Sequence, residues 1–132
     1  MEQIKFSFED LEVWQKAVKF IGIVLELTES VSTQRKHYRV IEQLEAASTS
    51  IALNIAEGKG RYSKKEFIQF LYFARGSLNE TITLLILFNK MKWIDEIQFK
   101  NTMIFAEEIS KMISGLINSV RYSGTLNSAP KY

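Results

Sequence analysis

The sequence of 132 residues contains no cysteine, one histidine and one proline. Without cysteine there can be no disulfide framework, thiolate metal site or cysteine nucleophile, and nothing indicates an oxidising compartment, so we expect a cytoplasmic protein. A carboxylate-bridged metal bundle needs a Glu-x-x-His pair on each of two helices, which His37 alone cannot supply. We therefore predict no metal and no cofactor, and we expect His37 to lie solvated on the surface.

Long apolar runs are missing as well, since the longest are far shorter than the roughly 20 residues of a membrane-spanning helix. The opening residues also lack the basic segment and apolar stretch of a secretion signal. We expect neither membrane insertion nor export.

Helix-breaking residues are scarce, because Pro130 is the only proline. Four segments instead repeat apolar residues at steps of three and four, which indicates amphipathic helices. They run from about Phe8 to Val31, from the polar turn at 32–36 to Gly58, from Ser63 to about Lys90, and from Asp95 to Arg121. Similar lengths and short turns favour an all-α fold, an antiparallel up-down-up-down four-helix bundle over residues 1–121. Residues 122–132 are small, polar and unpatterned, so we expect a flexible tail.

Capping residues mark the helix starts. Ser63 with Glu66 and Asp95 with Gln98 have the spacing of a capping box, and Ser7 could cap a helix that begins near Phe8. At the other end of a helix, Gly58 and Gly60 could take up the left-handed conformation that terminates it.

Apolar residues cover more of two helices than one contact needs. The first helix has one stripe of Leu11, Trp14, Val18, Ile21, Leu25 and Thr28 and a second of Val13, Ala17, Phe20, Val24 and Leu27. The third helix is apolar almost all round towards its end, through Phe70, Phe73, Leu84, Ile86, Leu87 and Phe88. Exposing these faces would leave a larger patch than monomers usually show, so we predict self-association.

Positive charge is concentrated in one stretch although the net charge is only +2. Residues 35–65 hold seven Lys and Arg against three acids, whereas residues 1–34 hold three against six. The cations form two groups, Arg35, Lys36 and Arg39 before the second helix and Lys59, Arg61, Lys64 and Lys65 after it. The second group surrounds a helix N-terminus, which suits phosphate. A solvated turn with solubilising lysines is the other interpretation.

No set of residues suggests catalysis. The segment Gly58-Lys59-Gly60-Arg61 follows a helix and lacks the Gly-Lys-Ser/Thr ending of a phosphate loop. Adjacent Glu107 and Glu108 lie about 100° apart on a helix and cannot face each other as an acid and a base. We therefore expect a protein that is not an enzyme.

The segment Ser50-Ile51-Ala52-Leu53-Asn54-Ile55-Ala56-Glu57-Gly58, followed by Gly60-Arg61 and Ser63, resembles the central motif of the 23S rRNA intervening-sequence protein family. Phe8-Glu9-Asp10-Leu11-Glu12-Val13-Trp14-Gln15 is similar to the family's opening, and Gly76-Ser77-Leu78 with Glu80 to its third helix. The resemblance extends over roughly residues 6–120. One departure is Glu45, where relatives have arginine before the paired alanines.

The resemblance implies a bacterial four-helix bundle of a kind often described as ribosomal-protein-like. Similar proteins are the accessory variability determinants of diversity-generating retroelements, which form a pentamer with a basic surface and bind nucleic acid and a reverse transcriptase. Within the motif we expect Asn54 and Glu57 to hold the turn at Gly58 and Gly60 by bonding its backbone amides, with Arg61 paired to Glu57.

Two functions stay open at this stage. The first is a self-associating bundle that binds RNA or DNA through phosphates, at Lys59, Arg61, Lys64 and Lys65 or at Arg35, Lys36 and Arg39. The second is an adaptor that binds only other proteins.

Overall fold

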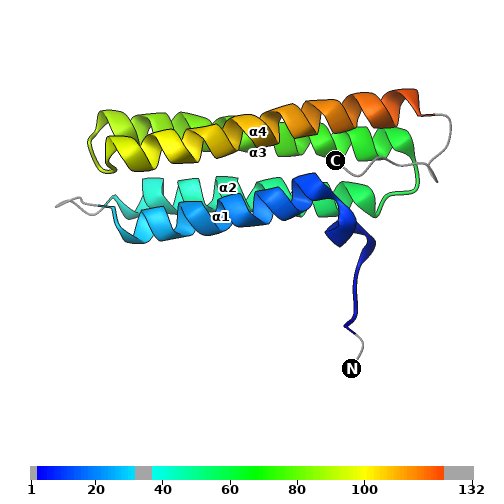
Figure 1. Ribbon diagram of the computed structural model, residues 1–132, viewed down its shortest axis with the longest axis horizontal. Helices are drawn as coiled ribbons and strands as arrows, with labels where there is room; N and C mark the ends of the chain where they lie inside the picture. The colour runs from blue at the N-terminus through cyan, green and yellow to red at the C-terminus, as the bar shows by residue number, and fades with distance from the viewer. Residues whose placement is uncertain (1–2, 32–36, 124–132) are drawn as a thin grey trace.

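The structure, a computed structural model, describes residues 3–31 and 37–123. A short 3-10 turn, η1 (Ser7–Asp10), is followed by four helices, α1 (Glu12–Glu29), α2 (Tyr38–Lys59), α3 (Lys64–Lys90) and α4 (Glu96–Tyr122). Figure 1 shows successive helices running in opposite directions, with α1 and α2 in one layer and α3 and α4 in the other. Within the described residues there is no strand, and the predicted all-α four-helix bundle is confirmed.

The core lies between the two layers, and α2 packs more extensively on α3 than α1 does on α4. On α1 the buried stripe is the one through Val13, Ala17, Phe20, Val24 and Leu27. The other stripe stays partly in solvent, because Val18 and Leu25 are 43% and 39% exposed. On α3 Leu84 and Phe88 are buried, while Phe73, Ile86 and Leu87 remain exposed.

The predicted caps of the last two helices are confirmed with one difference. Asp95 and Gln98 form a complete box, in which the Gln98 amide donates to Asp95 Oδ1 at 2.7 Å and the Asp95 amide to Gln98 Oε1 at 3.1 Å. At α3 the Glu66 amide donates to Ser63 Oγ at 3.1 Å. The Glu66 carboxylate accepts from the Ser63 hydroxyl rather than from its backbone amide, so this box is half formed.

The expected start of the first helix was wrong. Ser7 lies in η1, and α1 begins only at Glu12, after Leu11, which provides no side-chain cap. The break lies at Leu11, whose extended backbone (φ −75, ψ 121) separates η1 from α1, while Glu9 caps the start of η1 by accepting a bond of 2.7 Å from the Phe6 amide.

The left-handed helix end lies at Lys92, not at the glycines. Gly60 has φ −80, and none of the described glycines has a positive φ, whereas Lys92 has φ 61. Around Lys92 the Trp93 amide donates to Phe88 O at 3.0 Å and the Lys92 amide to Asn89 O at 3.0 Å. With the Trp93 ring packed on Phe88, this is a Schellman motif.

No described helix is both long and apolar enough to cross a membrane. The predicted tail lies outside the described residues from position 124 onwards, and α4 extends one residue past Arg121.

Candidate nucleic-acid interface

The end of the bundle that holds the α2–α3 turn carries the cations of the second basic group. We call this end the basic corner, made of Lys59, Arg61, Lys64, Lys65, Arg75 and Arg121. Lys59 ends α2, Lys64 and Lys65 open α3, and Lys64 Nζ donates to the backbone oxygen of Ser123 just after α4. Three helices therefore meet at this corner.

Gly58 allows the close helix contact beneath the basic corner. A Cβ atom there would lie 2.7 Å from Phe70 Cβ and 3.1 Å from Phe67 Cδ1. Such distances are shorter than packed carbon atoms tolerate, so only glycine lets the end of α2 approach α3 this closely. Glycine is therefore needed at position 58 because a side chain would collide with α3, and not because the backbone is left-handed there.

Arg61 is held by two partners. Its guanidinium donates to Glu57 Oε1 at 2.8 Å, which confirms the expected pair, and it also lies 4.7 Å from the centre of the Phe70 ring. Asn54 acts elsewhere, because its amide nitrogen donates to Ser50 O at 2.8 Å inside α2. The expectation that Asn54 bonds the glycine turn was therefore wrong, and the same holds for Glu57, whose carboxylate bonds the Arg61 side chain.

The lysines differ in how far they are available. Lys59 is half-buried, with Nζ 5.9 Å from the Phe67 ring centre, and Lys64 is half-buried beside Ser123. Lys65 is exposed. Lys59 and Lys64 are therefore only partly available to a ligand, because their stems lie on the protein surface.

Arg75 and Arg121 also belong to this corner, although the charge pattern of the sequence did not indicate them. Arg121, in the last turn of α4, donates to the Tyr72 hydroxyl at 2.7 Å, and the Arg75 guanidinium lies 4.7 Å from the Tyr72 ring centre. The bond from Arg121 lowers the pKa of Tyr72 below its ordinary value. The spacing of Tyr72 and Arg75, three residues apart on one helix, could have indicated their contact, but nothing local indicates Arg121.

The first basic group lies at the opposite end of the bundle. Arg39 is exposed in the first turn of α2, about 30 Å from Lys59 at 1.5 Å per residue, while Arg35 and Lys36 lie outside the described residues. Next to it, His37 is half-buried and stacks on Trp93 with 4.6 Å between ring centres. His37 is therefore only partly solvated, which corrects the expectation that it lies fully solvated on the surface.

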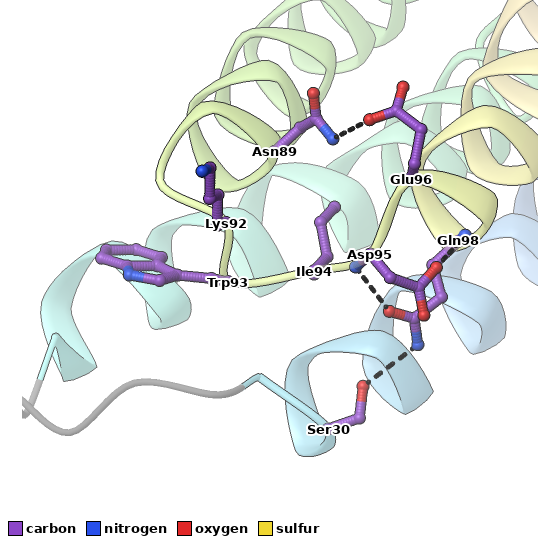
Figure 2. Close-up of a pocket in the computed structure, with 8 residues that line it drawn as sticks. All are labelled: Ser30, Asn89, Lys92, Trp93, Ile94, Asp95, Glu96 and Gln98. Atoms are coloured by element: carbon purple, nitrogen blue, oxygen red, sulfur yellow. Dashed lines mark hydrogen bonds between the residues drawn. The ribbon is translucent and has the colours of Figure 1, made fainter.

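A shallow pocket of about 600 Å³ opens at this opposite end, beside the α3–α4 turn. Figure 2 shows Lys92 among Asp95, Glu96 and several neutral side chains, with Asn89 bonded to Glu96 and Gln98 reaching Ser30. Two carboxylates against one cation do not suit a polyanion. Phosphate chemistry is therefore better supported at the basic corner.

The comparisons with known proteins agree with this fold. Residues 9–115 match the family model described as 23S rRNA-intervening sequence protein. The chain belongs to this family. It is also similar to a crystal structure from Bacteroides thetaiotaomicron, described as a protein of unknown function from the S23 ribosomal protein family. That similarity has a TM-score of 0.74 and 27% identity and covers 80% of this chain and 97% of the other. No curated protein matches the chain.

Proposed function

We propose that this family member is a non-enzymatic, self-associating bundle that binds RNA or DNA through phosphates at the basic corner. The observation that carries the proposal is the gathering of six cations from three helices at one end of the molecule. In the segment 57–66 the carboxylates are Glu57, which is paired with Arg61, and Glu66, while η1 and the first turn of α1 bring Glu9, Asp10 and Glu12 to the same end of the bundle. Around the α2–α3 turn itself the cations therefore outnumber the carboxylates, as polyanion binding requires.

The arrangement suits phosphates better than base edges. The first turn of α3 directs backbone amides and the positive end of its dipole towards the corner. The cations come from several elements rather than from one helix or strand that could enter a groove, so they suit contacts to the phosphate backbone rather than to base edges.

Self-association is part of the proposal because one subunit offers few cations. On α1 the exposed Val18 and Leu25 continue a stripe with the half-buried Trp14 and Ile21. A second copy could cover this stripe, and a pentamer is the assembly that the family resemblance suggests. Each added subunit would bring another basic corner to the same nucleic acid, which raises the affinity through multivalency.

The rival function is an adaptor, for example for a reverse transcriptase, that uses the same apolar stripe for a different protein. It predicts no affinity for nucleic acid, or an affinity that hardly depends on salt. Counterion release separates the two functions, because phosphate binding weakens steeply as salt is added.

The test is a salt titration of binding to RNA and DNA of about 20 nucleotides. Replacing Lys59, Lys64 and Lys65 by glutamine should weaken binding and lower the slope of log affinity against log salt by about two units. The matched control replaces the exposed Lys19, Lys90 and Lys100 elsewhere on the surface, which changes the net charge equally. Salt-insensitive binding by the wild type, or equal effects of the two triple changes, would contradict the proposal. Light scattering checks the assembly of each variant.

A further inference from the structure

We propose that the basic corner takes single-stranded nucleic acid and that unpaired bases stack on Tyr62 and Phe73. This inference rests on the proposed function and narrows it, because it names the form of nucleic acid. It is carried by aromatic side chains that the fold leaves exposed between the cations.

Tyr62 is the most exposed of these rings. It lies in the α2–α3 turn, directly after Arg61 and two residues before Lys64, and it is 95% exposed. A ring in this position contributes almost nothing to the core. Its whole face is available to a flat, apolar partner, and it is flanked by cations that hold a phosphate backbone nearby.

Phe73 is exposed for a different reason. Its ring is 47% exposed and stands edge-on against Phe70, with 5.5 Å between centres and an angle of 88°. Arg61 rests on the same Phe70 ring at 4.7 Å. One partly buried ring therefore supports both an exposed aromatic face and a guanidinium, so a base and its phosphate could be held without reordering the side chains.

Gly76 leaves room next to Phe73. On a helix it adjoins Tyr72 and Phe73, which lie four and three residues earlier. A Cβ at Gly76 would meet no atom within 4 Å, so packing within the chain does not require glycine there. Since Arg75 already covers the Tyr72 ring, the open helix surface at Gly76 gives a planar base access to the Phe73 ring.

These features favour a single strand over a duplex. In a duplex the bases already stack on one another and their faces are closed to side chains, whereas an unpaired strand offers a face at every nucleotide. Stacking of this kind tolerates any base, and either RNA or DNA satisfies it.

The test compares oligo(U) and oligo(dT) of about 20 nucleotides with hairpin duplexes of the same phosphate count. Tyr62→Leu and Phe73→Leu should each weaken single-strand binding about tenfold while leaving the salt slope and duplex binding unchanged, because stacking releases no counterions. Tyr38→Leu is the matched control, since Tyr38 is 61% exposed at the far end of α2. Gly76→Gln should weaken single-strand binding although it removes a helix-destabilising glycine.

The possible failures are distinguishable. Salt-dependent binding that is equal for single strands and duplexes, with neutral aromatic variants, overturns the stacking site and leaves the proposed function standing. Absence of salt-dependent binding overturns the proposed function itself. If Tyr62→Leu or Phe73→Leu changes the mass measured by light scattering, the rings belong to an interface between copies, and the stacking proposal is wrong.

Discussion

The chain reverses direction between long helices at both ends of the bundle, and the α2–α3 and α3–α4 turns do so with different residues and conformations. At the basic corner a glycine, Gly58, sits in ordinary helical conformation and is required by the space beside Phe70. At the other end a lysine, Lys92, takes the left-handed conformation that usually favours glycine. Steric room therefore fixes the turn at the basic corner, whereas hydrogen bonds and the Trp93–Phe88 contact fix the turn at the opposite end.

Of the substitutions considered, the one at Gly58 should change the free energy of unfolding most. Gly58→Ala should lower the free energy of unfolding by about 2 kcal/mol, since the new methyl group overlaps Phe70 near its backbone. Gly22→Ala and Gly76→Ala are matched controls with nothing within 4 Å, and each should raise stability by about 0.5 to 1 kcal/mol. Urea denaturation measures all three. Equal behaviour of Gly58 and Gly22 would show that the corner is not sterically closed.

The N-caps of α3 and α4 should differ in how much each contributes to stability. Asp95→Ala removes the side chain of a complete capping box and should cost about 1 to 2 kcal/mol, whereas Ser63→Ala at the half-formed box should cost about 1 kcal/mol or less. Thermal unfolding monitored by circular dichroism compares the two variants with the wild type. A greater loss of stability for Ser63→Ala than for Asp95→Ala would contradict the conclusion that the Asp95 cap is the more complete one.

Replacing Lys92, which has a positive φ in the α3–α4 turn, should raise the stability of the protein slightly. Lys92→Gly relieves a positive φ and should stabilise the protein by up to about 1 kcal/mol, because glycine populates this region without a steric penalty. Lys90→Gly, two residues earlier in helical conformation, should be destabilising by a similar amount. Opposite signs in chemical denaturation would confirm that conformation, not charge, decides the effect.

The smallest effect concerns titration at the basic corner. The bond from Arg121 lowers the pKa of Tyr72, so this tyrosine should ionise before the others in an absorbance titration at alkaline pH. The resulting stabilisation is fully present above the ordinary tyrosine pKa of about 10 and is lost as pH falls through the lowered folded value. Arg121→Ala should abolish the early ionisation, whereas Lys100→Ala should not. An unchanged titration would mean that Arg121 does not bond Tyr72 in solution.

Local signals were enough for much of the fold. Ser63 and Asp95 fixed the starts of α3 and α4 because capping depends on residues three positions apart. The buried stripe of α1 could not be chosen from the sequence, since Leu11 and Val13 begin two apolar stripes and only the neighbouring helices decide between them. The helix start is interrupted by extended backbone at Leu11, which the apolar pattern does not reveal.

The candidate site was predictable only where its residues are close in sequence. Lys59, Arg61, Lys64 and Lys65 stood out as one cluster, but Arg121 joins them only because α4 returns to the same end of the bundle. The role of Gly58 also depends on α3, because the glycine is required by Phe70 and not by its own φ. Contacts between helices are the information that periodicity lacks.

The bond between Lys64 and the backbone oxygen of Ser123 places residue 123 next to the basic corner, where a label would report on binding. Because the chain has no cysteine, Ser123→Cys would create a unique thiol for a fluorescent dye at the edge of the corner. Such a dye would report, from one defined place, how near an incoming strand or neighbouring subunit comes. The same labelled protein could then follow assembly and nucleic-acid capture in a single cuvette.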